Sequence, residues 1–189
     1  RVEELAEAQR RTEQRVEELA EAQRRTEETL RASIARQDRM ERKLDSLVGD
    51  QLERRYREKA HSYFGRFLRR VRAVAFYEIE EQVEKRLAEA ELDELRLLDL
   101  LVRGHLREKP ELPEVWLTIE VSATVDRGDV ERARRRAALL RKAGYLAVPV
   151  VAGEDATQGG AQAASEEHVV LLQDGTVEFW DQALEQALA

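Results

Sequence analysis

VWLTIEVSATVDRGDVERARRRAALLRKAGYLAVPVVAG, residues 115–153, is the stretch that decides the fold. Its two ends are rich in apolar and β-branched residues, so we expect strands at residues 114–122 and 145–153. Between them, a helix is expected from about residue 129 to 143, and Gly144 suits the position just after a helix end. A strand, a helix and a strand in this order predict two parallel strands joined by a right-handed crossover. This part of the chain is therefore α/β.

Further strands and helices are expected on both sides of this unit. LRLLDLLV, residues 95–102, is expected to be a strand, and HVVLL and TVEFW, separated by Gln173-Asp174-Gly175, predict a hairpin. Pro149 cannot donate to a strand ladder, which suggests a bulge or pairing on one side. Residues 51–75 are expected to dock a helix onto the core, although residues 71–76 could supply a first strand. We also expect a helix at residues 78–91, a Gly/Ala/Gln-rich loop after residue 153 and a short helix from Asp181.

The N-terminal part of the chain contains an internal repeat. RVEELAEAQRRTE occurs at residues 1–13 and again at residues 15–27. A period of 14 is two heptads, which predicts a coiled coil. Layers of Val and Leu alternate with layers of Gln and Thr at the a and d positions, which are Val2, Leu5, Gln9, Thr12, Val16, Leu19, Gln23, Thr26 and Leu30, continuing less regularly to Met40, Leu44 and Leu47.

We therefore expect two parts in the chain: residues 1–50 as a coiled-coil stalk that makes a homo-oligomer, and residues 51–189 as the α/β domain. The alternative for the first part is a lone solvated helix, or a helix bound to an unrelated partner. The chain starts at Arg1 rather than Met, as a fragment of a longer protein would.

Composition excludes several classes of protein. Charged residues make up 38% of the 189 residues and aromatic residues 5%, a charge excess typical of a long solvated helix. The chain has no cysteine, so disulfides and thiolate zinc sites are excluded. Apolar runs are far shorter than the roughly 18 residues needed to cross a bilayer, and no signal peptide opens the chain. We expect a cytoplasmic protein with no membrane partner.

The distribution of charge says more about partners than the net charge of −7 does. Residues 54–72 carry eight basic residues and one acidic residue, and residues 121–145 carry seven basic and three acidic residues. Such segments are compatible with a face that binds the phosphates of DNA or RNA. The alternative is a solvated face paired with the acidic segments of the chain. The candidate nucleic-acid-binding residues are Arg54, Arg55, Arg66, Arg69, Arg70 and Arg135.

Two carboxylates lie inside apolar segments, Asp99 in LLDLLV and Glu120 in WLTIEV. Strand alternation puts Glu120 and Ser122 on the face opposite to residues 115, 117, 119 and 121. A carboxylate in such a strand must lie near an end, find a cation or remain protonated. If the two strands are neighbours, both carboxylates could bind one hard divalent cation together with a backbone carbonyl. The alternative is a structural salt bridge with Arg103, Arg132 or another arginine.

The order of an acid-bearing strand, a Glu-x-x strand, an Arg-rich helix and an apolar strand resembles the PD-(D/E)XK, or restriction-endonuclease-like, superfamily. LLDLLVRG, IEVSATVDRGDVERARRRAALL and GYLAVPVVAGE, within residues 49–155, are similar to an uncharacterised prokaryotic group in it whose members carry an N-terminal coiled coil. The resemblance implies a mixed sheet with flanking helices, preceded here by the long coiled-coil helix. It also implies that Asp99 and Glu120 ligate Mg²⁺ or Mn²⁺ together with the carbonyl of Val121, and that Glu53 is an accessory acidic residue.

The chain departs from the superfamily pattern at two places. The lysine of the motif should be residue 122, where this chain has Ser122, and a serine hydroxyl can only hydrogen-bond. The superfamily sometimes moves this charge to a neighbouring element, so Arg132 or Arg135 could stand in for it; arginine stabilises charge but can hardly act as a base. The second departure is a helix expected between the first strand and Asp99.

Two functions follow as hypotheses. The first is a coiled-coil-tethered, Mg²⁺-dependent nuclease in which Asp99, Glu120, Ser122 and Arg132 form the catalytic site. The second is a nuclease fold without catalysis, assembled by its stalk and docking nucleic acid or an acidic partner. The three histidines, His61, His105 and His168, are expected at the surface or at caps, and Gly159-Gly160 in a flexible loop.

Overall fold

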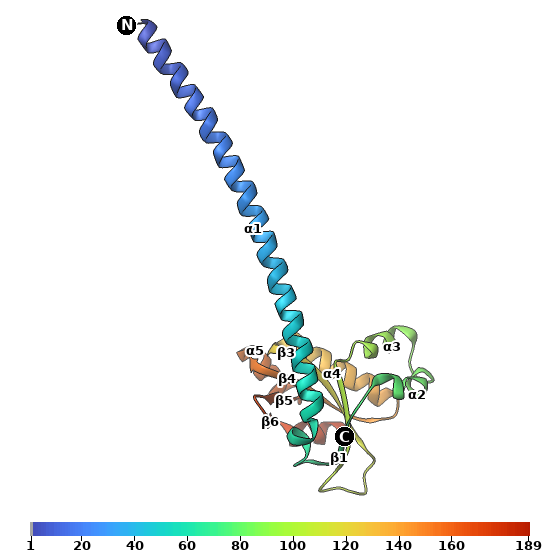
Figure 1. The fold of residues 1–189 in the computed structure, drawn as a ribbon. Coiled ribbons are helices and arrows are strands. Elements are labelled where there is room, and N and C mark those ends of the chain that lie inside the picture. The colour runs from blue at the N-terminus through green and yellow to red at the C-terminus, as the bar shows by residue number, and fades with distance from the viewer. Residues whose placement is uncertain (1) are drawn as a thin grey trace. The chain divides into compact units, whose positions relative to one another are not determined.

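The computed structural model describes residues 2–189, except for the side chains of residues 3–6, 8, 9 and 41–46. The chain divides into two compact units, Arg1–Ser46 and Leu47–Ala189. Helix α1 (Val2–Phe64) makes up the described part of the first unit and supplies residues 47–64 to the second (Figure 1). Of the expected seam of the coil, the side chains of Leu5, Gln9 and Leu44 lie outside the described residues.

The second unit is α/β, with a mixed sheet of six strands flanked by helices. The strands lie in chain order: β1 (Leu68–Val74), β2 (Leu100–Leu106), β3 (Val115–Val125), β4 (Leu146–Ala156), β5 (Val170–Gln173) and β6 (Thr176–Glu178). The pairs β3–β4 and β4–β5 are parallel, and the other three pairs are antiparallel. The helices after α1 are η1 (Phe76–Glu78), α2 (Glu80–Glu84), α3 (Glu89–Arg96), α4 (Arg127–Lys142), α5 (Gln158–Glu166) and α6 (Trp180–Leu188).

The predicted strand–helix–strand unit is confirmed, because β3 and β4 are parallel and α4 connects them. Pro149 of β4 pairs with Thr118 of β3. The pairing of β4 with β5 begins at the next residue of β4, Val150, so Pro149 pairs on one side as predicted. The hairpin of β5 and β6 is also confirmed. Asp126 starts α4, because its carboxylate accepts a hydrogen bond from the backbone N–H of Asp129.

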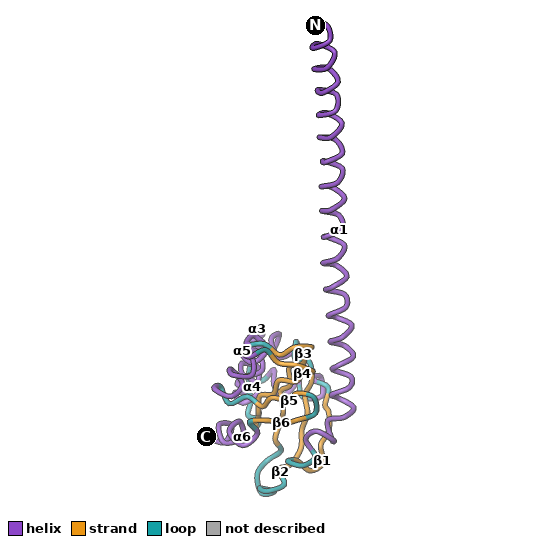
Figure 2. The backbone as a smooth tube through the Cα atoms, turned by 90° about the vertical axis from the view of Figure 1, so that its left-hand side faces the viewer, coloured by secondary structure: helices purple, strands orange, loops and turns teal. Residues whose placement is uncertain are grey.

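The two faces of the sheet pack against different helices. Alternation along β3 is as predicted: Leu117 and Ile119 share a buried cluster with Tyr56 and Phe64 of α1, whereas Trp116 packs in a second cluster with Leu140 of α4. In α1, the residues that pack on the sheet recur every four positions: Leu52, Tyr56, Ala60 and Phe64. Figure 2 shows the sheet between α1 on one side and α4 and α5 on the other. In the part of the chain that the structure describes, no helix combines the length and apolar character needed to cross a bilayer.

Three predicted elements were wrong in their bounds. The helix expected at residues 51–75 ends at Phe64, and the next residues form β1, whose buried Leu68 and Val74 pair with β2. The helix expected at residues 78–91 is replaced by η1, α2 and α3, because the Glu91 carboxylate accepts from the N–H of Ala88 and starts a new helix there. The strand expected at residues 95–102 begins only at Leu100, since α3 continues to Arg96.

The loop expected after residue 153 was also wrong. β4 continues to Ala156, and residues 158–166 form α5, in which Thr157 caps the first turn by accepting from the N–H of Gly160. Gly160 is needed for close packing rather than for flexibility. A Cβ atom at residue 160 would lie 2.5 Å from the carbonyl oxygen of Val125.

Candidate active site

Asp99 and Glu120 come together at one end of the β2–β3 pair. Asp99 is the residue just before β2, and the register of Leu100 opposite Ile119 brings it beside Glu120 and Val121. The Asp99 Oδ2 atom accepts a hydrogen bond of 2.8 Å from the backbone N–H of Val121. The strands at Asp99 and Glu120 are therefore neighbours, as the shared cation site would require, but Asp99 lies just before its strand and not inside it.

Glu120 is buried and bonded to an arginine that the sequence argument did not single out. Its side chain is 3% exposed, and Arg136 Nη1 lies 2.6 Å from Oε1 and 2.7 Å from Oε2. Arg132 Nε lies 3.5 Å from Oε2. Arg136 also donates to the carbonyl of Leu97 at 2.8 Å and lies 3.2 Å from Glu94. The expected alternative of a structural salt bridge with Arg103, Arg132 or another arginine is present at Glu120 through Arg136 and Arg132, whereas Arg103 pairs with Glu114.

A sequence signal for Arg136 exists in α4. The buried side chains of this helix are Asp129, Val130, Ala133, Arg136, Ala137 and Leu140, which form one face. Arg136 is the one arginine of α4 on that face, three residues after Ala133 and four before Leu140. A charged residue on the apolar face of a helix needs a buried partner, and Glu120 is the matching residue on the adjoining strand.

Burial dominates the electrostatics of the carboxylates. It raises the pKa of Glu120 to about 7, and the negative charge of Asp99 adds to this rise, while Arg136 and Arg132 oppose it. Burial also raises the pKa of Asp99, against the hydrogen bond from Val121. The pKa of Glu53 on α1 is raised by burial and next by the charge of Asp99, so a third carboxylate is electrostatically coupled to the pair.

Ser122 and Arg132 lie on the α4 side of the carboxylate pair. The hydroxyl of Ser122 donates to the carbonyl of Thr124 at 3.1 Å. Arg132 makes an ion pair with Asp129 in addition to its contact with Glu120. Burial raises the pKa of Asp129, and the Asp126 N–H and Arg132 oppose that rise. Arg132 is therefore the solvent-accessible cation beside Glu120, because its side chain is 43% exposed whereas that of Arg136 is 5% exposed.

The oxygen donors at this site have the right chemistry for Mg²⁺ or Mn²⁺. Asp99 and Glu120 supply carboxylates, and the carbonyl of Val121 follows in the same strand. Among the described residues, however, no group of three or more His, Cys, Asp or Glu side chains has an arrangement that could hold a metal ion. Both oxygens of Glu120 also contact Arg136, so a cation shared by the two carboxylates requires that contact to open.

The six candidate nucleic-acid-binding residues do not gather in one place. Arg69 lies opposite His105, and Arg70 follows it, near the end of β2 that is about 20 Å from Asp99. Two of the six, Arg55 and Arg135, pair with Glu154 at 3.0 Å and with Glu94 at 2.9 Å, and the guanidinium of Arg66 lies over the Phe67 ring.

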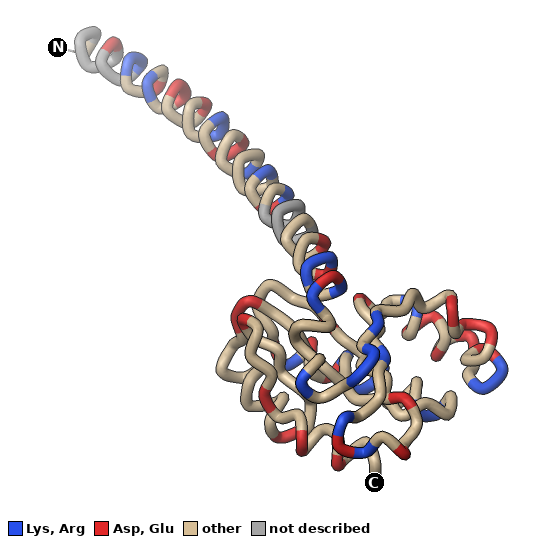
Figure 3. Tube along the Cα trace, turned by 60° about the horizontal axis from the view of Figure 1, so that its bottom comes forward, with Lys and Arg blue, Asp and Glu red and all other residues tan. Residues whose placement is uncertain are grey.

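Of the six, Arg54 is exposed on α1, and Arg135 is exposed on α4 beside Arg136. Arg54 follows Glu53, and no ion pair to Arg54 is found in the described part of the chain. Figure 3 shows the basic and acidic residues along the backbone. The six residues therefore do not form the single phosphate-binding face that the sequence led us to expect.

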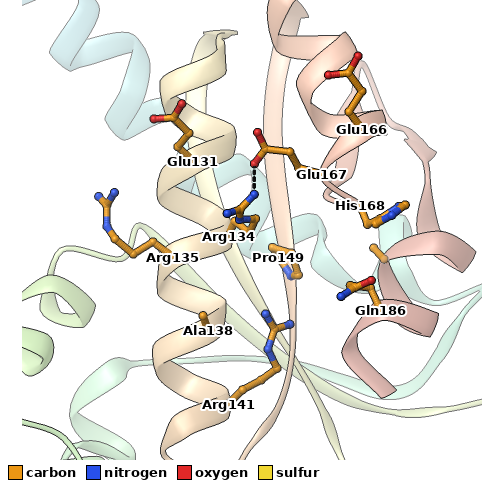
Figure 4. A pocket seen from close by; sticks show the side chains of 11 residues that line it. Glu131, Arg134, Arg135, Ala138, Arg141, Pro149, Glu166, Glu167, His168 and Gln186 are labelled. Carbon is orange, nitrogen blue, oxygen red and sulfur yellow. Dashed lines mark hydrogen bonds and ion pairs between the residues drawn. The ribbon is translucent and has the colours of Figure 1, made fainter. Parts of the chain in front are cut away.

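A cavity of about 720 Å³ lies elsewhere, between α4, the end of α5 and α6 (Figure 4). Its lining includes Arg134, Arg141 and His168 but neither Asp99 nor Glu120. Arg134 pairs with Glu167 at 2.6 Å, and Arg141 donates to the carbonyl of Ala147 at 2.9 Å. His168 lies just after the C-cap of α5 with a positive φ of 54°, in agreement with the expected cap position, and its Nδ1 atom is buried with no hydrogen-bond partner among the described residues.

Comparison of the chain with family models, curated proteins and solved structures finds no significant match.

Proposed function

We propose that this protein is a metal-dependent nuclease, with a restriction-endonuclease-like fold of the PD-(D/E)XK type, that hydrolyses phosphodiesters of DNA or RNA. The observation that carries the proposal is the meeting of Asp99, just before β2, with Glu120 of the adjacent strand β3, where burial and the charge of Asp99 raise the pKa of Glu120 to about 7. Carboxylate pairs with such perturbed pKa values are typical of functional sites. The order of β2, β3, α4 and β4 also agrees with the motif order on which the resemblance rests.

In this proposal each residue of the site has a separate role. Asp99, Glu120 and the carbonyl of Val121 would hold Mg²⁺ or Mn²⁺, with Glu53 as an accessory acid, and the ion would supply an activated water for attack on the phosphorus. Arg132 stabilises the charge that develops on the phosphate, because residue 122 is a serine and cannot supply a positive charge. Ser122 contributes a hydrogen bond.

The proposed substrate contact lies beside the carboxylates. Arg132 on α4 contacts Glu120 and reaches solvent, and Arg54 is an exposed cation of α1 that follows Glu53 in the sequence; both would contact the phosphates. The proposal includes a cytoplasmic location, where nucleic acids are accessible, and assembly into a homo-oligomer through residues 1–50.

A second candidate function is a nuclease-like scaffold without catalysis. The contact of Arg136 with both oxygens of Glu120 favours it, because that guanidinium neutralises the carboxylate without a metal. The serine at residue 122 favours it as well. In this case the fold would dock nucleic acid or an acidic partner, with the stalk providing assembly.

A cleavage assay tests the first function against the second. Supercoiled plasmid, single-stranded DNA and RNA are incubated with the full chain in millimolar Mg²⁺ or Mn²⁺. We expect cleavage by the wild type, loss of cleavage in Asp99→Asn and Glu120→Gln, and loss on chelation of the metal. Glu131→Gln, an exposed position on α4, is the matched control and keeps activity. An inactive wild type, or an Asp99→Asn variant as active as the wild type, would contradict catalysis at this site and favour the scaffold.

A further inference from the structure

The helix of the first unit carries a row of exposed apolar side chains. Val16, Leu19, Leu30 and Met40 are 58%, 68%, 59% and 61% exposed, and all of them occupy a or d positions of the heptad pattern. Leu47, at a further d position, is 58% exposed. Exposed apolar side chains in one row along a helix gain free energy when another helix covers them.

We propose that the occupant of this row is a second copy of the same helix, parallel to the first and in register with it. This deepens the assembly part of the proposed function, and it holds whether or not the protein cleaves nucleic acid. In parallel register each layer meets its own copy, so Leu19 meets Leu19 and Met40 meets Met40. The polar layers then also meet polar layers, as Gln23 meets Gln23 and Thr26 meets Thr26.

The polar layers can be covered at low cost in this arrangement. The hydroxyl of Thr26 donates to the carbonyl of Ala22 at 2.8 Å within its own helix, so covering it leaves no unpaired donor. Gln23 has both a donor and an acceptor in its amide, which allows two facing copies to bond to each other. In the single helix Gln23 contacts Glu27 at 3.3 Å. When two copies face each other, the Gln23 amide would give up its contact with Glu27 and bond to Gln23 of the other copy.

Residues after the repeat select the register. An identical repeat of 14 residues would by itself allow two helices to slip by 14 positions with the same contacts. A slip of 14 places Leu19 opposite Ser33 and Thr26 opposite Met40, so two apolar side chains meet polar ones. The unslipped register has no such mismatch, and residues 33 and 40 therefore act against slippage.

The antiparallel alternative is disfavoured by packing and by charge. With the helices fully overlapped in opposite directions, Val16 lies opposite Ser33. Arg15 and Arg36, both at g positions, then lie across the seam from each other, and like charges repel. In a parallel pair, position g faces position e of the partner, where Arg15 meets Ala20. The parallel arrangement avoids the repulsion.

The second unit begins at Leu47, so in a parallel pair the second units of both copies are joined to the same end of the stalk.

Cysteine cross-linking of the full chain tests the proposal, because the chain contains no natural cysteine. Single variants Val16→Cys and Leu30→Cys are oxidised mildly and separated on a non-reducing gel. We expect each to form a disulfide-linked dimer with itself. Glu21→Cys, an exposed f position, is the matched control and stays unlinked.

Mixtures of two different cysteine variants, one of which carries an affinity tag, show the register and direction of the two helices. Tagged Val16→Cys mixed with Leu30→Cys reports a slip of 14, and tagged Leu19→Cys mixed with Leu30→Cys reports the antiparallel pair. We expect the mixed species to be at least about tenfold weaker than the self-linked dimers. Predominance of either mixed species would overturn the proposal, as would a monomer mass of 21.8 kDa by light scattering at tens of micromolar chain. Neither outcome depends on nuclease activity.

Discussion

Arg136 of α4 lies with Nη1 2.6 Å and 2.7 Å from the two carboxylate oxygens of Glu120 in β3, and both side chains are at least 95% buried. This contact joins the crossover helix to the sheet at the candidate site. It also decides how the site can work, because any cation that binds Glu120 must compete with a guanidinium.

Arg136→Gln should destabilise the protein by about 3–5 kcal/mol, because it leaves a buried carboxylate without its partner. Urea unfolding at about pH 8, above the Glu120 pKa of about 7 so that the carboxylate is ionised, measures the change in free energy of unfolding. The matched control is Arg135→Gln, the exposed neighbour that pairs with Glu94, which should cost about 1 kcal/mol or less. Equal costs for the two variants would show that the Glu120 contact contributes little.

Glu120 should make stability fall with pH over the range from 4.5 to about 7. The folded chain holds a proton on Glu120 up to the raised pKa of about 7, whereas the unfolded chain loses it near 4.5. The folded state therefore binds more protons between these values, and its free energy of unfolding decreases as pH rises. Urea titrations with a chelator present check this, comparing the wild type with Glu120→Gln. The variant should show a smaller decrease; an equal slope in both proteins would exclude Glu120 as the cause.

Mn²⁺ should raise the melting temperature, and it should do so more strongly at about pH 7.5 than at about pH 5.5. A metal bound by Glu120 must displace the proton that the raised pKa retains, so apparent affinity increases with pH. Thermal unfolding with millimolar Mn²⁺ at both pH values measures the shift. Asp99→Asn should remove it. A shift that persists in this variant would place the ion elsewhere.

Arg54→Gln should weaken nucleic-acid binding more than Arg69→Gln does. Both arginines are exposed, but Arg54 follows Glu53 at the carboxylate end, and Arg69 lies at the opposite end of β2. Fluorescence anisotropy with labelled DNA over a range of salt concentrations gives the affinity and its salt dependence. Loss of one phosphate contact should reduce the slope of log K against log salt by about 0.9 for duplex DNA. Equal effects of the two variants would argue against Arg54 as a substrate contact.

Gly160→Ala should destabilise the protein by roughly 1–3 kcal/mol, because the new Cβ would lie 2.5 Å from the Val125 carbonyl oxygen and α5 would have to move. Gly159→Ala is the matched control, since nothing lies within 4 Å of its Cβ position. That variant should gain up to about 1 kcal/mol from helix propensity. Denaturant unfolding measures the change in free energy of unfolding for both variants. Changes of the same sign in the two variants would show that α5 does not pack tightly against β3.

Sequence patterns predicted the elements whose periodicity is long or strictly alternating. The alternation from residue 115 to residue 121 placed Leu117 and Glu120 on the correct faces of β3, and the strand–helix–strand order predicted the parallel pair. Elements whose bounds depend on a single cap or a single close contact were not predicted. α5 depends on the Thr157 cap and on the packing of Gly160, and α3 begins where Glu91 caps Ala88.

The candidate site was predicted in part for a similar reason. Asp99 and Glu120 stood out because carboxylates are rare within apolar strands, and the pairing of β2 with β3 brought them together. Arg136 lies in an arginine-rich run, residues 132–136, and composition alone does not distinguish one arginine of this run from another. The helical period separates it, because residue 136 faces the sheet with Ala133 and Leu140 while Arg135 faces solvent.

The most direct test of the proposed metal site is a crystal structure of the protein with Mn²⁺ soaked in, using the anomalous signal of the metal. The proposed function predicts an anomalous peak between the carboxylates of Asp99 and Glu120, at about 2.0–2.3 Å from their oxygens, with the Arg136 guanidinium moved off Glu120. A structure without a peak there, in which Arg136 Nη1 still contacts both oxygens of Glu120 at millimolar Mn²⁺, would contradict the proposed function.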